Sequence, residues 1–333
     1  MHIPIADLAG NTIMPLLPSR FRQGPSYLFK GHFQTILPST LRRLPPVKYL
    51  RERIVTPDQD FLDLDWSRVN STTLVVLSHG LEGDTHRPYM KGMVRAMNIA
   101  GWDALAWNFR SCSGEPNHQL HSYHMGAVED LDLVVRHALA SGLYQTIYLV
   151  GFSMGGNLTL NYLGQWTDRV PAQVERAAVF SVPCHMKSAC TQLAKPTNRI
   201  YMRRFLKSLH EKLKEKSQRF EVDLTGYEKI TTFEQFDDRY TAPFHGFESA
   251  ADYYERCSSI SHLHKIKIPT LLVNAQNDPF LSKECFPVEQ AKQNPHFYLE
   301  TPKEGGHVGF SEDFLKGLYY SERRAVEFLK GII

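Results

Sequence analysis

Short apolar runs rich in β-forming residues alternate with longer runs of helical periodicity, and this alternation constrains the fold of the chain most. The order strand, helix, strand is typical of a mostly parallel sheet. Because the strand-like runs are apolar on both sides of the pleat, we expect helices to cover both faces of that sheet. The fold class predicted is therefore α/β. The runs that we assign to strands are TTLVVLSHG, DALAWNFR, TIYLVGFS, RAAVFSVP, TLLVNAQND and HFYLET.

Glycines mark the ends of the first two predicted helices. Gly101 ends RPYMKGMVRAMNIAG and Gly142 ends GAVEDLDLVVRHALASG, and glycine is a usual C-terminal stop. NLTLNYLGQW and SERRAVEFLKGI are further helical runs. Ahead of the first strand, RERIVTPDQDFLDLDW has two β-like runs around the turn residues Pro57 and Asp58, which predicts a hairpin at the edge of the sheet.

One segment, from about Cys184 to His262, interrupts the alternation. It lacks a convincing buried strand and contains a basic amphipathic run, RIYMRRFLKSLHEKLKEKSQRF. An insertion of this length between two core strands predicts a helical lid over the strand ends, with an ordinary pair of surface helices as the alternative. We therefore predict one domain over residues 1–333, with an N-terminal arm (1–50), a core (51–183 and 263–333) and a lid (184–262).

The side chains of the predicted lid allow more than one interpretation. Its cations indicate either a solvated helix face or attraction to an anionic substrate or membrane surface. They are Lys187, Arg203, Arg204, Lys207, Lys212, Lys214 and Lys216. Four apolar residues could line an acyl pocket or only attach the lid to the core: Ile200, Met202, Phe205 and Leu206.

Composition excludes several classes of protein. A net charge of +3 over 333 residues argues against a nucleic-acid binder that neutralises many phosphates. The 5 cysteines are scattered and never spaced as CxxC, so neither a disulfide framework nor a zinc ribbon is expected, and a reducing, cytoplasmic location fits best. The N-terminal run lacks the pattern of a secretory signal, and no run approaches the ~18 apolar residues of a membrane helix. We expect no stable membrane insertion, while the oligomeric state stays open.

The stretch YLVGFSMGGNLTL places a serine where a strand gives way to a helix. In G-x-S-x-G the small residues Gly151 and Gly155 allow so tight a turn that Ser153 lies at its apex with its hydroxyl exposed. The motif alone is weak, but a strand before it and a helix after it favour a catalytic nucleophile over a structural turn. The helix that begins at Met154 also directs free N–H groups toward the space above the serine.

A nucleophilic serine needs a base and an acid that orients the base, and both should follow it in the order Ser, Asp, His. Asp278 comes just after the strand TLLVNAQND, where open α/β sheets place functional groups, although Asp-Pro is also a common turn. His307 lies in PKEGGHVGF, a loop after the last predicted strand. We predict Ser153, Asp278 and His307 as the catalytic residues.

An oxyanion hole needs two backbone N–H donors. One is expected from Met154, the residue after the nucleophile, and the other from the loop in LVVLSHGLEGD. In that loop Leu81 is the best donor and Glu82 the next.

Metal and nucleotide chemistry find little support. His118, His121 and His124 are spaced three apart, but no fourth ligand lies nearby, so we favour a polar loop over a zinc site. The chain has no dinucleotide fingerprint or P-loop motif. We expect no metal and no organic cofactor.

Several blocks together resemble the α/β-hydrolase superfamily, and within it the YheT-like esterases of the AB hydrolase 4 family. Relatives of that group include ABHD1/ABHD3-type hydrolases and yeast medium-chain fatty acid ethyl ester synthases. The blocks are GHFQTILPSTLRR, SHGLEGD, NFRSCSGEPN, YHMG, GFSMGGN, FDDRYTAPFHGFESAADYY, NAQNDPF and EGGHVGF. The resemblance implies an α/β-hydrolase fold, a triad of Ser153, Asp278 and His307, and an oxyanion loop in HGLEG. Where the family has RGCSGEPN this chain has Ser111, which would be strained if the position requires a positive φ.

These observations predict a serine carboxylesterase acting on a small-molecule ester with a short or medium acyl chain. Transfer of the acyl group to an alcohol is one alternative, which the resemblance to ester synthases permits. A non-catalytic scaffold of the same fold is the other.

Overall fold

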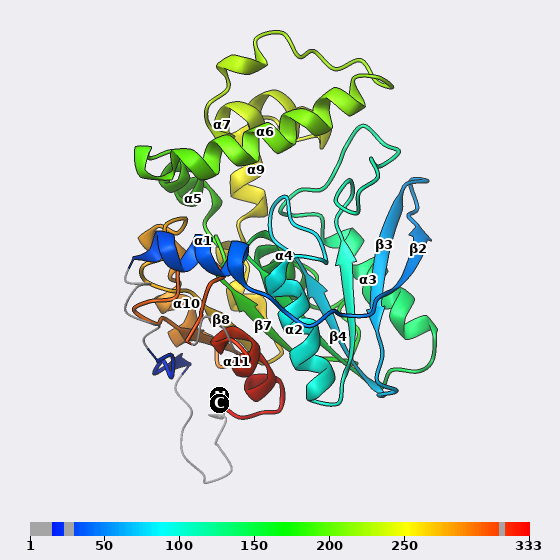
Figure 1. Cartoon of the computed structure of the whole chain (residues 1–333), viewed down its shortest axis with the longest axis vertical. Coiled ribbons are helices and arrows are strands. Elements are labelled where there is room, and N and C mark those ends of the chain that lie inside the picture. The colour runs from blue at the N-terminus through cyan, green and yellow to red at the C-terminus, as the bar shows by residue number, and fades with distance from the viewer. Residues whose placement is uncertain (1–14, 23–29, 313–316) are drawn as a thin grey trace.

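The computed structural model describes residues 15–22, 30–312 and 317–333 (Figure 1). Residues 1–14 and 23–29, which belong to the predicted N-terminal arm, lie outside the described residues. Within the described part of the chain, no helix has both the length and the apolar character needed to cross a bilayer.

One sheet of nine strands organises the described chain, in the order β1-β9-β8-β7-β6-β4-β5-β3-β2. Only β3 runs against its neighbours β2 and β5, and all other pairs are parallel. The strands are β1 (Leu16–Leu17), β2 (Leu50–Val55), β3 (Phe61–Ser67), β4 (Thr73–Ser78), β5 (Asp103–Asn108), β6 (Thr146–Phe152), β7 (Val174–Phe180), β8 (Thr270–Val273) and β9 (Phe297–Glu300). The predicted α/β class and the edge hairpin, β2 with β3, are confirmed.

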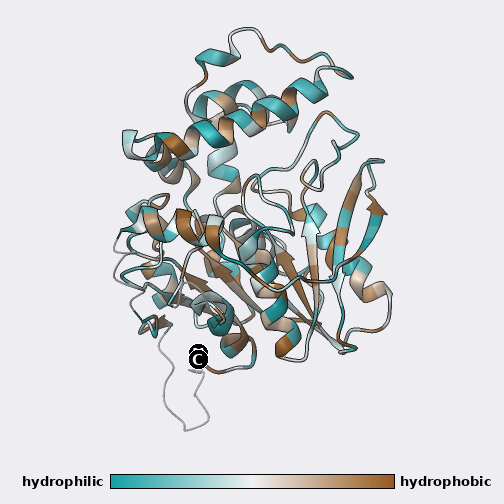
Figure 2. Cartoon of the chain, in the orientation of Figure 1, coloured by the Kyte–Doolittle hydropathy of each residue, from teal (hydrophilic) through white to brown (hydrophobic). Residues whose placement is uncertain are grey.

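Helices cover both faces of the sheet because side chains alternate along each strand. On β4, Val75 and Leu77 face a cluster formed with α2 (Pro88–Ile99) and α11 (Tyr320–Leu329). Leu74 and Val76 face the opposite cluster, formed with α3 (Val128–Ala140), α4 (Met154–Gln165) and α10 (Val288–Gln293). The strands accordingly appear mostly hydrophobic in Figure 2.

The segment 184–262, here called the lid segment, contains helices and no strand, and all of it is described. It lies beyond the carboxyl ends of the parallel strands, with α6 running across the upper part of the molecule (Figure 1). Its helices are α5 (Met186–Leu193), α6 (Arg199–Lys216), α7 (Phe233–Phe236), α8 (Ala242–Phe244) and α9 (Ala250–Cys257). Helices α5 to α8 contribute to a separate apolar cluster that includes Met202, Leu206 and Tyr240, whereas α9 packs with Met186 of α5 in another.

Helix α1 (Gly31–Leu41) lies between the lid segment and the sheet, within the region predicted only as an arm (Figure 1). His32 Nδ1 lies 3.1 Å from the hydroxyl of Tyr201 on α6, and the two rings stack. The arm therefore contributes a helix that contacts the lid segment.

Candidate active site

Ser153 lies at a strained turn between β6 and α4. Its φ of 51° and ψ of −116° are rarely adopted by a residue with a Cβ. Its backbone N–H donates to Phe180 O at 2.8 Å, and its carbonyl accepts from Asn157 N at 3.0 Å, so the turn is held at both ends. In this conformation Ser153 lines a cavity, and its hydroxyl lies within hydrogen-bond distance of His307.

Two glycines of the motif are required by close approach of the backbone. A Cβ on Gly151 would lie 2.5 Å from Gly155 O, and one on Gly155 would lie 2.4 Å from the carbonyl oxygens of both Ser78 and His79. The turn from Gly151 to Gly155, here called the elbow, therefore packs directly against the segment that follows β4. Since β4 and β6 are parallel neighbours, with Ser78 opposite Gly151, the two loops emerge side by side.

The side chains of Ser153, His307 and Asp278 form a continuous hydrogen-bonded chain. His307 Nε2 lies 3.0 Å from Ser153 Oγ, and His307 Nδ1 lies 2.8 Å from Asp278 Oδ2. The Asp278 side chain is 0% exposed, and the ring of Phe280 lies 4.1 Å from the imidazole, centroid to centroid. An imidazole held between a carboxylate and a hydroxyl is placed to accept the hydroxyl proton.

Helix α1 holds the loop that carries His307, a role that the sequence analysis missed. Thr35 Oγ1 accepts from His307 N at 2.9 Å, and Gln34 Oε1 accepts from Gly305 N at 2.8 Å. Gln34 Oε1 also accepts from Asn277 Nδ2 at 2.8 Å, next to Asp278. The block GHFQTILPSTLRR contains both residues, so its resemblance to the family was the available signal.

The loop after β4 forms a tight turn from Gly80 to Gly83, closed by a 2.9 Å bond from Gly83 N to Gly80 O. His79 anchors it: Nε2 accepts from Phe109 N at 3.1 Å, and Nδ1 lies 2.8 Å from Gly80 O. Burial lowers the pKa of His79 to about 4, so the ring is neutral and Nδ1 carries the proton that Gly80 O accepts.

Leu81 and Met154 both line the same cavity as Ser153. Within the described residues, their backbone N–H groups have no hydrogen-bond acceptor. The N–H of Glu82 is instead donated to Tyr123 Oη at 3.2 Å. Of the two candidate donors in this turn, Leu81 is therefore the one left free to bind an oxyanion.

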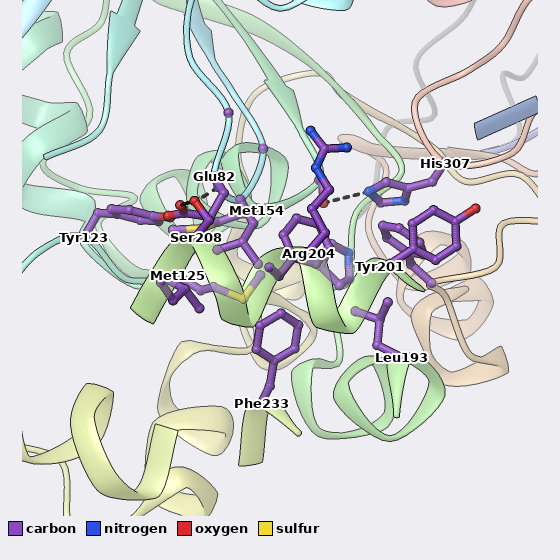
Figure 3. A pocket seen from close by; sticks show the side chains of 18 of the residues that line it. Glu82, Tyr123, Met125, Met154, Leu193, Tyr201, Arg204, Ser208, Phe233 and His307 are labelled. Carbon is purple, nitrogen blue, oxygen red and sulfur yellow. Dashed lines mark hydrogen bonds between the residues drawn. The ribbon is translucent and has the colours of Figure 1, made fainter. Parts of the chain in front are cut away.

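The cavity above Ser153 has a volume of about 550 Å³, within the usual range for small-molecule sites. Figure 3 shows His307 on one side of it, and Glu82, Tyr123 and Ser208 together on the other. The lid segment supplies much of its apolar wall, including Leu193, Phe205, Leu209, Phe233 and Phe236.

The structure shows where the apolar and basic side chains of the lid segment lie, for which the sequence left alternatives open. Of the four apolar residues considered for an acyl pocket only Phe205 lines the cavity, since Met202 and Leu206 are buried in the lid cluster and Ile200 is 76% exposed. Lys212 and Lys216 are not part of a solvated face. They point inward, Lys212 to Glu82 at 2.7 Å and Lys216 to Asn117 Oδ1 at 2.7 Å.

The histidines of the loop that contains His118, His121 and His124 make structural contacts. Among the described residues, no group of three or more His, Cys, Asp or Glu side chains is arranged to hold a metal ion. His121 Nε2 lies 2.9 Å from Asp58 Oδ2, and the ring of His118 packs on Phe61.

Ser111 has a positive φ of 62°. Its hydroxyl donates to Asn117 Oδ1 at 2.5 Å and accepts from Asn117 N at 3.0 Å, and these bonds offset the strain.

Comparison with known proteins adds independent information. A model of the family described as serine aminopeptidase, S33 matches residues 70–286. The chain is 32% identical over 287 residues to the candidate esterase YheT of Escherichia coli, across 84% of each protein. It is 29% identical over 324 residues to the Homo sapiens protein named Phospholipase ABHD3, across 92% of this chain and 78% of that protein.

Solved structures support the same architecture. An esterase of Pyrococcus furiosus matches with a TM-score of 0.60 over 86% of this chain and 91% of its own. Because the identity is 19%, this likeness concerns the fold.

Proposed function

The chain belongs to the serine aminopeptidase S33 family of the α/β-hydrolase superfamily, and from this premise we propose that it is a serine hydrolase that cleaves carboxylic esters. The observation that carries the proposal is the hydrogen-bonded chain from Ser153 Oγ through His307 to Asp278. It lies in an apolar cavity large enough for an acyl chain.

In the proposed reaction His307 Nε2 accepts the proton of Ser153 as Oγ attacks the acyl carbonyl. Asp278 stabilises the imidazolium, and the N–H groups of Leu81 and Met154 bind the oxyanion of the tetrahedral intermediate. His307 then donates the proton to the leaving alcohol. Water, activated by the same imidazole, hydrolyses the acyl-enzyme and restores Ser153. No step requires a metal or organic cofactor.

Hydrolysis of p-nitrophenyl esters of increasing acyl length, from acetate to palmitate, tests this function. We expect the highest kcat/KM with short or medium chains, because the cavity lined by the lid side chains has a volume of about 550 Å³. Ser153→Ala should lower kcat by ~10⁵-fold or more, while the surface variant Ser141→Ala should keep full activity. If a fluorophosphonate probe leaves folded wild-type protein unlabelled at Ser153, the chain is a non-catalytic scaffold and the proposal is wrong.

Cleavage of phospholipids is a second candidate, favoured by the similarity to proteins named Phospholipase ABHD3. Arg204 of α6 lines the cavity and offers a cation for a phosphate group (Figure 3). Release of fatty acid from phosphatidylcholine, compared with release from a neutral ester of the same acyl chain, distinguishes the two. Arg204→Gln should weaken hydrolysis of the phospholipid alone.

Acyl transfer shares the acyl-enzyme and differs only in the acceptor. Product analysis in the presence of added ethanol separates the two activities. A hydrolase yields mainly the free acid, whereas an acyltransferase yields the ethyl ester.

A further inference from the structure

Glu82 is a buried carboxylate beside the proposed oxyanion donor Leu81. Its side chain is 6% exposed and accepts from three donors, two of which, Tyr123 and Ser208, are labelled in Figure 3. Lys212 Nζ donates to Oε1 at 2.7 Å, Ser208 Oγ donates to Oε2, and Tyr123 Oη donates to Oε1. Two of these donors, Lys212 and Ser208, belong to the lid helix α6. The turn from Gly80 to Gly83 is therefore hydrogen-bonded directly to the lid segment.

The backbone at Glu82 needs such support. Glu82 is the third residue of the turn from Gly80 to Gly83, and its φ is 53°. Turns with a positive φ at this position usually have glycine there, because a Cβ makes the conformation unfavourable. The hydrogen bonds that its side chain accepts and the one that its backbone N–H donates to Tyr123 Oη hold Glu82 in this conformation.

Electrostatic interactions favour the ion pair between the Glu82 carboxylate and Lys212. Burial works against its charge, but Lys212 and the donated hydrogen bonds hold the pKa of Glu82 below its ordinary value. A buried carboxylate that loses its cation is strongly unfavourable. Displacement of α6 would therefore leave Glu82 in an environment that favours rotation toward water.

One face of α6 makes the connection. Ser208, Lys212 and Lys216 are spaced four residues apart, so they lie on the same side of the helix. Lys216 Nζ bonds to Gln119 O at 2.6 Å in the loop that leads to Tyr123. Lys207 lies on another face with its side chain 80% exposed. The helix thus provides a matched pair of lysines, one inward and one in solvent.

We propose that Glu82 couples the lid to catalysis: when α6 is seated, Lys212 and Ser208 hold Glu82 in its strained conformation, and this positions Leu81 N–H in the oxyanion hole. The inference rests on the proposed function and makes Glu82 a positioning residue. The oxyanion hole is then complete only while Lys212 and Ser208 of α6 are bonded to Glu82.

Kinetics of two lysine variants test the link. Lys212→Met keeps the length of the side chain and removes its charge, and it should lower kcat at least ~10-fold with KM within ~2-fold, because only transition-state binding depends on the oxyanion hole. Lys212→Arg should restore most of the loss. Lys207→Met should match the wild type. A Lys212→Met enzyme with wild-type kcat overturns the proposal.

A double-mutant cycle tests whether the effect passes through Glu82. Glu82→Gly removes the carboxylate and tolerates the positive φ, so in that background Lys212→Met should change kcat by less than ~2-fold. An equal loss in both backgrounds shows that Lys212 acts by another route and overturns the coupling.

Amide exchange measures the connection without relying on turnover. In Lys212→Met, exchange of the amides of Glu82 and Gly83, which donate to Tyr123 Oη and Gly80 O, should accelerate at least ~10-fold, while Lys207→Met leaves it unchanged. Unchanged exchange in Lys212→Met overturns the link even if the enzyme is active. Failure of the proposed function has a different signature, namely wild-type protein that is neither labelled at Ser153 nor active on any ester.

Discussion

Gly155→Ala tests whether close packing of the elbow is needed for activity. The added Cβ would lie 2.4 Å from the carbonyl oxygens of Ser78 and His79, although real Cβ contacts are essentially never shorter than 3.0 Å. Both atoms are backbone, so no side-chain rotation relieves the clash. The loop after β4 and the start of α4 must separate by at least about 0.6 Å.

The separation moves apart the two N–H groups proposed to bind the oxyanion, because Leu81 follows His79 and Met154 precedes Gly155. A misplacement of about 1 Å can cost ~100-fold in rate, so a shift of about half that distance should lower kcat/KM by ~10-fold or more. Overpacking of this kind should also lower the free energy of unfolding by about 1–3 kcal/mol.

Gly142→Ala is the matched control. Gly142 ends α3 with a φ of 69°, and a Cβ there would have no atom within 4 Å. This variant should lose about 1 kcal/mol of stability through strain alone and keep its kcat/KM. Steady-state hydrolysis of a p-nitrophenyl ester and thermal unfolding of both variants give the comparison. Wild-type kcat/KM in Gly155→Ala would refute the argument that packing of the elbow sets the oxyanion hole.

Four further changes have defined outcomes. Asp278→Asn should lower kcat by ~10³- to 10⁴-fold in ester hydrolysis, because the amide no longer orients or stabilises the protonated His307. Gln34→Leu removes the acceptor of Gly305 N and should lower kcat ~10-fold with little change in the free energy of binding a substrate analogue. Leu209→Trp narrows the cavity and should shift the preference in an acyl-length series toward shorter chains. Burial raises the pKa of Asp237 from 3.8 to about 6. Between these pH values the folded chain holds a proton that the unfolded chain has lost, so this contribution to stability is complete below about pH 4 and lost as pH rises through about 6. In denaturant unfolding at a series of pH values, the free energy of unfolding of Asp237→Asn relative to that of the wild type should therefore rise by about 3 kcal/mol across this window, and a difference that does not change with pH would contradict the assignment.

Strands and glycine-ended helices of the core were predictable because their signals are local. Hydrophobic periodicity shows in any window of the sequence, and Gly101 and Gly142 mark helix ends without reference to the rest of the fold. The edge hairpin was equally accessible from Pro57 and its neighbours. The chain order of Ser153, Asp278 and His307 selected three residues whose side chains the structure brings within hydrogen-bond distance, and their catalytic role stays a prediction.

Contacts between distant segments were not predictable in this way. The sequence analysis predicts only an arm over residues 1–50, whereas the structure has helix α1 there, with Pro38 inside it, a residue that local patterns disfavour in a helix. Its contact with the loop of His307 joins residues more than 270 positions apart. Lys212 looked like part of a solvated basic face, and only its pairing with Glu82 shows that it points inward.

The sequence alone determined the α/β class, the sharp turn at Ser153 and the identity of the three residues that meet there. Each depends on local backbone preferences or on the order of strands along the chain. Tertiary structure decided which N–H groups stay free, which lid side chains face the cavity, and that Glu82 joins the lid to the turn beside Ser153. These properties depend on the direction and burial of side chains from segments far apart in sequence, which no local pattern contains.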